Sequence, residues 1–243
     1  MTPKLTLIYS YYNAPKMLAT HYNHLAGFST ATKLQMELVI VDDGSQVAPA
    51  VDVPRPEGLP PLQIWRIKED KFFNWPGARN LGAKVARGEW LLITDLDHMV
   101  PEDTARAMMA DVVAGTVYRF ARLDYPELTP TLGKRGEHKR HPNSWGMEKS
   151  MYWKIGGHDE FFSGHYGFDG VYHSRVEQHA KIIERPEALW RVPRDVVADA
   201  STDHKALKAA RPPNYHKMMR AKKDASPSRG QILTFQFTYE RQL

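Results

Sequence analysis

The chain has 243 residues and a mass of 27.8 kDa, which suits one domain with or without a short extension. Hydrophobic residues make up 42% of it and charged residues 25%, a composition that argues against a largely disordered chain. The sequence contains no cysteine, which excludes disulfides, thiolate metal sites and cysteine nucleophiles. Any bound metal must therefore be held by Asp, Glu, His or carbonyl oxygen, a set of ligands that favours Mg²⁺ or Mn²⁺ over Zn²⁺.

The net charge of +5 is unevenly distributed along the chain. Residues 171–243 contain 14 Lys and Arg against 8 Asp and Glu, whereas residues 1–170 contain 19 and 20. A polyanionic partner would therefore be sought first on the C-terminal third. No apolar run reaches the roughly 18 residues of a transmembrane segment, and the short apolar run after Lys4 is too brief for a signal-peptide core. We therefore expect a cytoplasmic protein without a transmembrane segment.

Strands and helices are expected to alternate through the first half of the chain. Apolar, β-branched and aromatic runs predict strands at residues 4–11, 37–42, 62–67, 89–94 and 116–121. Helical spacing predicts helices at 15–27, 75–87 and 101–113. This alternation predicts an α/β fold with a mostly parallel sheet, in which ligands bind beyond the carboxyl ends of the strands.

The second half has a different character. Residues 124–143 show no periodicity and include a basic cluster at 134–141, so this stretch is either a lid over a site or a solvated loop. Helical stretches are expected near 170–180 and 204–223, and a strand at 232–239. We predict a core of residues 1–170 and a basic, helical extension of residues 171–243 within the same compact unit.

Polar turns follow three of the predicted strands. They are Tyr11–Asn13, Asp42–Ser45 and Asp95–His98. Because the carboxyl ends of parallel strands meet at one edge of a sheet, we expect these turns to converge.

The Asp95-Leu96-Asp97 turn is a candidate metal site. Alternation along the chain lets both carboxylates face the site while Leu96 points back to the core. Two carboxylates at a strand end suit a hard divalent cation that bridges phosphate oxygens. The alternative is a solvated turn in which one acid caps the next helix.

Two further segments are candidates for binding a nucleotide. Asp42 or Asp43 would accept a hydrogen bond from a base or a ribose hydroxyl, or else form an Asx turn before Gly44. Arg79, near the start of the 75–87 helix, would reach a diphosphate or else lie on the surface.

The order of these motifs resembles the GT-A fold glycosyltransferases, in particular family 2. The similarity covers roughly residues 4–205, and its downstream part is similar to the acceptor side of the β-1,4-galactosyltransferase and polypeptide GalNAc-transferase group. The segments that carry it are Leu5–Asn13, Val41–Ser45, Gly77–Gly82, Asp95–Asp97, Gly156–Phe162 and Gly164–Asp169.

This resemblance implies a mixed, mostly parallel GT-A sheet flanked by helices, and a metal-dependent, inverting transfer of a sugar from a UDP-type donor to a hydroxyl. Asp169 matches the catalytic base, and His204 matches a later metal-binding histidine, for which His98 is a competitor. The family usually has further acids beside the base, but here Phe168 and Gly170 flank Asp169. The other implied roles are donor binding for Tyr11, Asn13, Asp42, Asp43, Arg79, Asp95 and Trp153, Mn²⁺ or Mg²⁺ binding for Asp95 and Asp97, and acceptor contacts for Asp159, Glu160 and Tyr166.

Several questions stay open at this level. Trp145, Tyr152 and Trp153 would either stack on sugar faces or belong to the core. The basic stretch 216–223 would meet a polyanionic acceptor, such as DNA with a modified base, a phosphorylated glycan or anionic lipid, or would simply be solvated. The competing functions are a nucleotidyltransferase or metal phosphohydrolase that uses the same acids, and a non-catalytic nucleic-acid-binding module.

Overall fold

The computed structural model of the chain describes residues 2–137, 139–166, 169–201, 208–209, 211–225 and 237–243. The strands are β1 (Leu5–Tyr11), β2 (Met36–Asp42), β3 (Leu62–Ile67), β4 (Trp90–Thr94), β5 (His98–Met99), β6 (Thr116–Asp124), β7 (Thr129–Pro130), β8 (Trp145–Glu148), β9 (Lys181–Arg191) and β10 (Tyr239–Arg241). The helices are α1 (Pro15–Ala26), α2 (Thr30–Lys33), α3 (Trp75–Val85), α4 (Glu102–Ala110), α5 (Lys149–Ile155), α6 (Asp169–His179) and α8 (Tyr215–Ala225), with short 3₁₀ turns η1 (Ala50–Asp52) and η2 (Glu160–Phe162).

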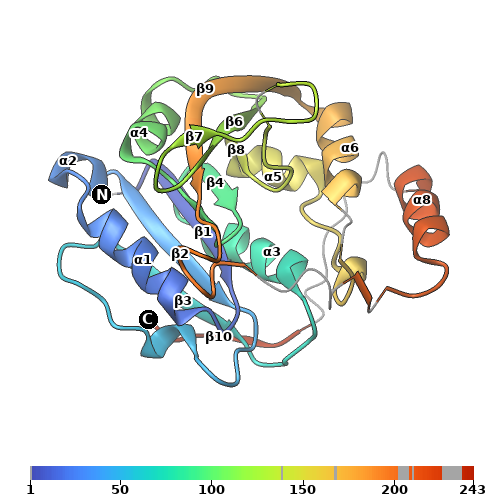
Figure 1. Cartoon of the computed structure of the whole chain (residues 1–243), viewed down its shortest axis with the longest axis horizontal. Coiled ribbons are helices and arrows are strands. Elements are labelled where there is room, and N and C mark those ends of the chain that lie inside the picture. Colours follow the sequence, from blue (N-terminus) through green and yellow to red (C-terminus); the bar gives the residue numbers. More distant parts are fainter. Residues whose placement is uncertain (1, 138, 167–168, 202–207, 210, 226–236) are drawn as a thin grey trace.

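One mixed sheet organises the molecule, with the strand order β10-β3-β2-β1-β4-β8-β6-β9-β5 (Figure 1). Strands β3, β2, β1 and β4 run parallel to one another, whereas β10 is antiparallel to β3 and β8 is antiparallel to both β4 and β6. Tyr11 at the end of β1 is in register with Asp42, and Tyr9 is in register with Thr94. The turns that follow β1, β2 and β4 therefore leave the sheet at the same edge.

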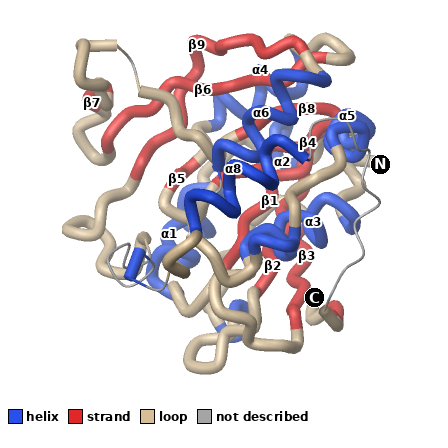
Figure 2. Tube along the Cα trace, turned by 90° about the vertical axis from the view of Figure 1, so that its right-hand side faces the viewer, coloured by secondary structure: helices blue, strands red, loops and turns tan. Residues whose placement is uncertain are grey.

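Helices cover both faces of the parallel strands, which explains why those strands are almost continuously apolar. Successive residues of β1 alternate between two buried clusters: Leu7 and Tyr9 pack on the side of α1 and α4, whereas Ile8 packs on the side of α3 and α5. Figure 1 shows α1, α2 and α4 on one side of the sheet and α3, α5 and α6 on the other. Figure 2 shows α6 and α8 on the outside of that second layer.

The strands and helices predicted for the first 121 residues are confirmed, with ends that shift by a few residues. Strand β9 was not predicted, because its half-exposed residues include charges and Pro186 and lack a clean alternation. It pairs in parallel with β6 around an irregularity between Phe120 and Ala121. The predicted helix 204–223 and strand 232–239 lie partly outside the described residues, which show α8 and β10 there.

Residues 171–243 contribute strands to the same sheet as well as helices. Strand β9 pairs with β6 and β5, and β10 pairs with β3 at the opposite edge. The division into a core and an extension stays a prediction. In the described ranges, no helix has both the length and the apolar character needed to cross a bilayer.

Helix α3 lies close to β1 because Gly82 has no side chain. A Cβ atom at this position would collide with Cγ2 of Ile8, a fully buried residue. We expect Gly82→Ala to lower the free energy of unfolding by about 1–3 kcal/mol, as overpacking of a core does. Urea denaturation measures the change. Gly170→Ala is the matched control, since a Cβ there would meet nothing, and it should change stability by no more than about 0.5 kcal/mol. Equal effects of the two substitutions would contradict the close-packing argument.

Candidate active site

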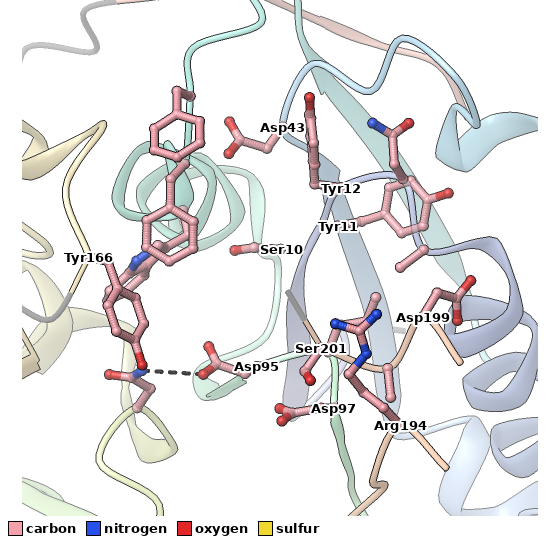
Figure 3. A pocket seen from close by; sticks show the side chains of 18 of the residues that line it. Ser10, Tyr11, Tyr12, Asp43, Asp95, Asp97, Tyr166, Arg194, Asp199 and Ser201 are labelled. Atoms are coloured by element: carbon pink, nitrogen blue, oxygen red, sulfur yellow. Dashed lines mark hydrogen bonds between the residues drawn. The ribbon is translucent and has the colours of Figure 1, made fainter. Parts of the chain in front are cut away.

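A cleft of about 710 Å³ opens where β1, β2 and β4 end. Figure 3 shows Tyr166 on one wall, Tyr11 and Tyr12 on the other, and the carboxylates of Asp95 and Asp97 near its floor. The charged and imidazole side chains that line it are Asp43, Asp70, Asp95, Asp97, His141, Asp169, Arg194 and Asp199. The convergence predicted from the sequence is therefore present in the structure.

Asp95 is held by a buried arginine. The Arg79 side chain has no exposed surface, forms an ion pair with Asp95 Oδ1, and lies 4.1 Å from the centre of the Trp75 ring. The second oxygen of Asp95 accepts a hydrogen bond of 3.2 Å from Asn143. Burial opposes the charge of Asp95, but Arg79 and a hydrogen bond from His141 outweigh it and hold the pKa of Asp95 well below its usual range.

Arg79 is itself held by a chain of buried polar groups. Its Nη1 lies 3.3 Å from Nε2 of His158, whose Nδ1 lies 2.9 Å from the hydroxyl of Tyr152. The Tyr152 hydroxyl donates in turn to Asn80 over 2.6 Å. Arg79 can only donate, so His158 Nε2 accepts and Nδ1 carries the proton. Burial and the nearby Arg79 keep the pKa of His158 well below its usual value, consistent with this neutral form. Arg79 is thus buried beneath the cleft, rather than exposed at the surface.

Among the described residues, Asp97, His98 and His141 form a set of possible metal ligands, with one potential ligand atom of each within 4.8 Å of the others. His98 Nδ1 lies 2.7 Å from Oδ1 of Asp97, and the two imidazole rings stack with centroids 3.9 Å apart. The other ring nitrogen of His98 is buried and has no hydrogen-bond partner among the described residues. Burial and the electrostatic effect of the neighbouring His98 lower the pKa of His141 to about 4, so the His141 ring is neutral near pH 7.

The metal ligands predicted from the sequence are only partly present in this set. Asp97 and the competing histidine His98 belong to it, whereas both oxygens of Asp95 already accept hydrogen bonds from protein groups. His204 lies outside the described residues. His141 was not predicted as a ligand, because the sequence showed it only as the last residue of a basic cluster in a long loop.

Contacts with distant segments fix the backbone of the Asp95–Asp97 turn. His21 on α1 contributes Nε2, which lies 2.6 Å from the carbonyl oxygen of Leu96 and donates to it. From the far side, the Val192 amide donates to the carbonyl oxygen of Asp97 over 2.8 Å. The turn is therefore held from α1 on one side and from the segment after β9 on the other.

The two acids after β2 have different surroundings. Asp42 is fully buried, and its two oxygens accept backbone amides of Ser45 and Ala50 at 2.7 and 2.8 Å, so that it shapes the turn. Asp43 lines the cleft, and its buried Oδ1 has no hydrogen-bond partner in the part of the chain that the structure describes. Burial raises the pKa of Asp43 well above its usual value. Of the two candidates, Asp43 is the one placed to meet a ligand.

The turn after β1 lines the cleft beside Asp43. The side-chain oxygen of Asn13 accepts the amides of Val47 and Ala48, and the Tyr11 hydroxyl donates to the Ala48 carbonyl over 2.5 Å. Asn13 adopts a positive φ of 45°, a conformation that asparagine tolerates better than most residues. These bonds join the first and second turns into one wall.

Asp169, the predicted base, is the first residue of α6 and lines the cleft. Burial and the nearby charge of Asp95 raise its pKa. Tyr166, from the same signature, also lines the cleft, with its ring 5.8 Å from that of Phe73.

The remaining predicted contacts lie outside the cleft lining. Asp159 accepts the backbone amide of Phe161 and so caps η2, and Glu160 accepts a hydrogen bond of 2.8 Å from Asn80. Trp153 packs against the core cluster on the α5 side. Trp145 and Tyr152 are buried in that cluster as well. These acidic and aromatic side chains therefore belong to the structural support on the α5 side of the sheet and do not line the cleft.

The fold and these motifs match known proteins. Residues 6–173 match the family model of Glycosyl transferase family 2. The chain belongs to this family. The GT-A resemblance and the mixed α/β fold class expected from the sequence are therefore confirmed. No curated protein matches the sequence.

Solved structures of glycosyltransferases share the fold at low sequence identity. S. aureus TarS 1–349 in complex with UDP-GlcNAc is 16% identical, with a TM-score of 0.64 over 90% of this chain and 65% of that one. GalNAc-T7 with UDP, GalNAc and Mn²⁺ is 14% identical, with a TM-score of 0.57 over 78% of this chain and 43% of that one. The family 2 chain thus spans less than two thirds of the length of these proteins.

The buried histidine beneath the Asp95–Asp97 turn makes a pH-dependent contribution to stability. Burial lowers the pKa of His21 to about 4, whereas in the unfolded chain it titrates near 6.5. As pH falls from 6.5 toward 4, the unfolded state takes up a proton that the folded state does not, so stability is lost on acidification. His21→Gln keeps a side-chain donor and removes this titration.

We expect the melting temperature of His21→Gln to fall less than that of the wild type between pH 7 and pH 4.5, a difference worth about 1–3 kcal/mol at the acid end. Thermal unfolding across this range measures it. The exposed His216 on α8 provides the control, and His216→Gln should retain the wild-type slope. Parallel slopes for all three proteins would show that His21 is not held neutral.

Proposed function

We propose that this family 2 chain transfers a sugar from a nucleoside diphosphate, with UDP favoured, to a hydroxyl acceptor by an inverting, metal-dependent mechanism. The observation that carries the proposal is the shared cleft at the strand ends, which Asp43, Asp97 and Asp169 all line. A nucleotide-binding acid, a metal-binding acid and a base are the three groups that such a reaction needs. TarS and GalNAc-T7, whose structures contain UDP or a UDP-sugar, support the choice of donor.

Asp97, His98 and His141 would hold the metal. A neutral His141 has one ring lone pair to offer. Its Nδ1 lies 2.8 Å from the Ser144 hydroxyl and its Nε2 lies 3.2 Å from Oδ2 of Asp95, so metal binding through Nε2 would replace the contact with Asp95. The unpartnered buried nitrogen of His98 also fits a site that a ligand completes. A divalent cation supplies charge that stabilises a departing diphosphate. Imidazole ligands favour a transition metal such as Mn²⁺ over Mg²⁺.

Asp169 would act as the base. In an inverting transfer the acceptor oxygen attacks the anomeric carbon on the face opposite the diphosphate. The bond from that carbon to the diphosphate oxygen breaks, and its electron pair leaves with the nucleotide. The acceptor proton passes to the Asp169 carboxylate. Its raised pKa makes Asp169 a stronger proton acceptor than an ordinary aspartate.

The negative charge of the cleft lining limits which acceptors can enter it. Its lining carries six aspartates, of which Arg79 neutralises only Asp95. We propose that the part of the acceptor that enters the cleft is uncharged. A polyanionic acceptor would place its charges outside, where His216, Lys217 and Arg220 are exposed on α8. Binding to such a polyanion should weaken steeply with salt.

The proposed ligands Asp97, His98 and His141 predict that the protein binds Mn²⁺ more tightly than Mg²⁺, which a binding measurement can test. Mn²⁺ should raise the melting temperature of the wild-type protein more than Mg²⁺ at equal concentration, because ligands that bind only the folded state stabilise it. His141→Ala should lose most of the Mn²⁺ shift, whereas the exposed His216→Ala should keep it. Equal shifts with both metals, unaffected by His141→Ala, would contradict this metal site.

Asp169→Asn tests the base. It should slow turnover of a UDP-sugar by about 10²–10⁴-fold, the usual worth of a positioned base, while the affinity for UDP is unchanged. Wild-type activity should fall with acidification at a pH above the ordinary aspartate range, because the pKa of Asp169 is raised. Release of UDP from a panel of UDP-sugars in the presence of Mn²⁺ provides the rate.

Glu177→Gln is the matched control, since Glu177 lies on the same helix and is paired with His173 at 3.4 Å. Near-normal turnover in Asp169→Asn would show that the base has been wrongly assigned. Release of pyrophosphate instead of UDP would indicate a nucleotidyltransferase. Function retained in both Asp97→Ala and Asp169→Asn would indicate a binding module without catalysis.

A further inference from the structure

Arg194 is a cleft residue that the sequence did not single out. It follows β9, which pairs with β5 so that Arg191 is in register with His98 and Trp190 with Met99. Immediately after this pairing, the Val192 amide donates to the carbonyl oxygen of Asp97 over 2.8 Å. Arg194 therefore comes only two residues after a direct link to the backbone of Asp97.

The segment on the other side of Arg194 is anchored as well. The Val196 and Val197 amides both donate to the carbonyl oxygen of Pro193 at 3.1 Å, which closes a turn around Arg194. The Asp199 carboxylate accepts the amides of Lys16 and Met17 at 2.8 Å and ties the turn to the start of α1. The backbone that carries Arg194 is thus fixed, while its side chain is exposed in the cleft.

The Arg194 guanidinium has no carboxylate within ion-pair distance among the described residues. Neighbouring arginines differ in this respect: Arg191 pairs with Asp124 at 2.7 Å, and Arg185 pairs with Glu187 at 2.8 Å. Figure 3 shows the Arg194 side chain among the residues that line the cleft, on the same side of the view as Asp97 and Asp199. An unpaired guanidinium in a cleft rich in carboxylates is an unused anion-binding group.

We propose that Arg194 binds the diphosphate of the nucleotide-sugar donor and stabilises the negative charge that develops on the departing nucleotide. This inference rests on the proposed function. Arg194 is the one lysine or arginine among the described residues that line the cleft. Guanidinium matches phosphate oxygens in both charge and geometry. Preorganised positive charge near the leaving group stabilises the transition state in particular.

If Arg194 binds the diphosphate, its loss should weaken binding of a nucleotide that carries a diphosphate but not binding of the nucleoside alone. A purely structural role would affect both ligands. Calorimetric titration with UDP and with uridine, both in the presence of Mn²⁺, separates the two. We expect Arg194→Ala to bind UDP about 10- to 100-fold more weakly than the wild type, since a hydrogen-bonded charge is lost, and to bind uridine equally well. Arg194→Lys should recover part of the UDP affinity, because it keeps the charge without the planar fork.

Arg106→Ala is the matched control, because Arg106 is an exposed arginine on α4 that is not among the residues lining the cleft. It should leave both affinities unchanged. Equal UDP affinity in wild type and Arg194→Ala would overturn the inference and leave the proposed function standing. Parallel losses for UDP and uridine would also overturn it, since they indicate a structural effect. A wild-type protein that binds no UDP in the presence of Mn²⁺ would refute the UDP-dependent function and this inference together.

Discussion

The buried ion pair between Arg79 and Asp95 is the interaction on which the geometry of the cleft depends. A guanidinium with no exposed surface needs a carboxylate, because an unpaired charge in the interior is strongly unfavourable. The pair joins the start of α3 to the end of β4. Through its second oxygen, Asp95 also contacts Asn143 and His141, both from the long loop after β6. One carboxylate thus connects a helix, a strand end and a loop.

Because of this ion pair, Asp95 and Asp97 have different partners. Asp95 is committed to the scaffold, where Arg79 and its chain of partners His158, Tyr152 and Asn80 hold it. Asp97 lines the cleft next to His98 and His141. Both acids lie in the turn that follows β4, and both line the cleft. Only their different neighbours explain why they have different roles.

The cleft combines acidic groups with His141 and with Arg194, which has no carboxylate partner among the described residues. Burial keeps His21 and His141 uncharged, so they contribute hydrogen bonds and lone pairs rather than positive charge. Asp43 and Asp169 have raised pKa values for the same reason, since burial penalises a carboxylate as it penalises an imidazolium. In the proposed function, a metal held by Asp97 and its histidine neighbours and the guanidinium of Arg194 would supply the positive charge that a diphosphate needs.

The sequence by itself determined the parallel strands, the acidic turns at their ends and the order of motifs that led to Asp97 and Asp169. These features are local: apolar runs and turn residues are read over a few positions. The tertiary structure decided that Arg79 supports Asp95 from below, that Asp43 rather than Asp42 lines the cleft, that His141 lies close to Asp97, and that Arg194 lines the same cleft. Those placements depend on pairing across long stretches of chain, such as β9 with β5 and β6. No local pattern specifies such pairing, because the energy that selects it comes from contacts that exist only once the sheet has formed.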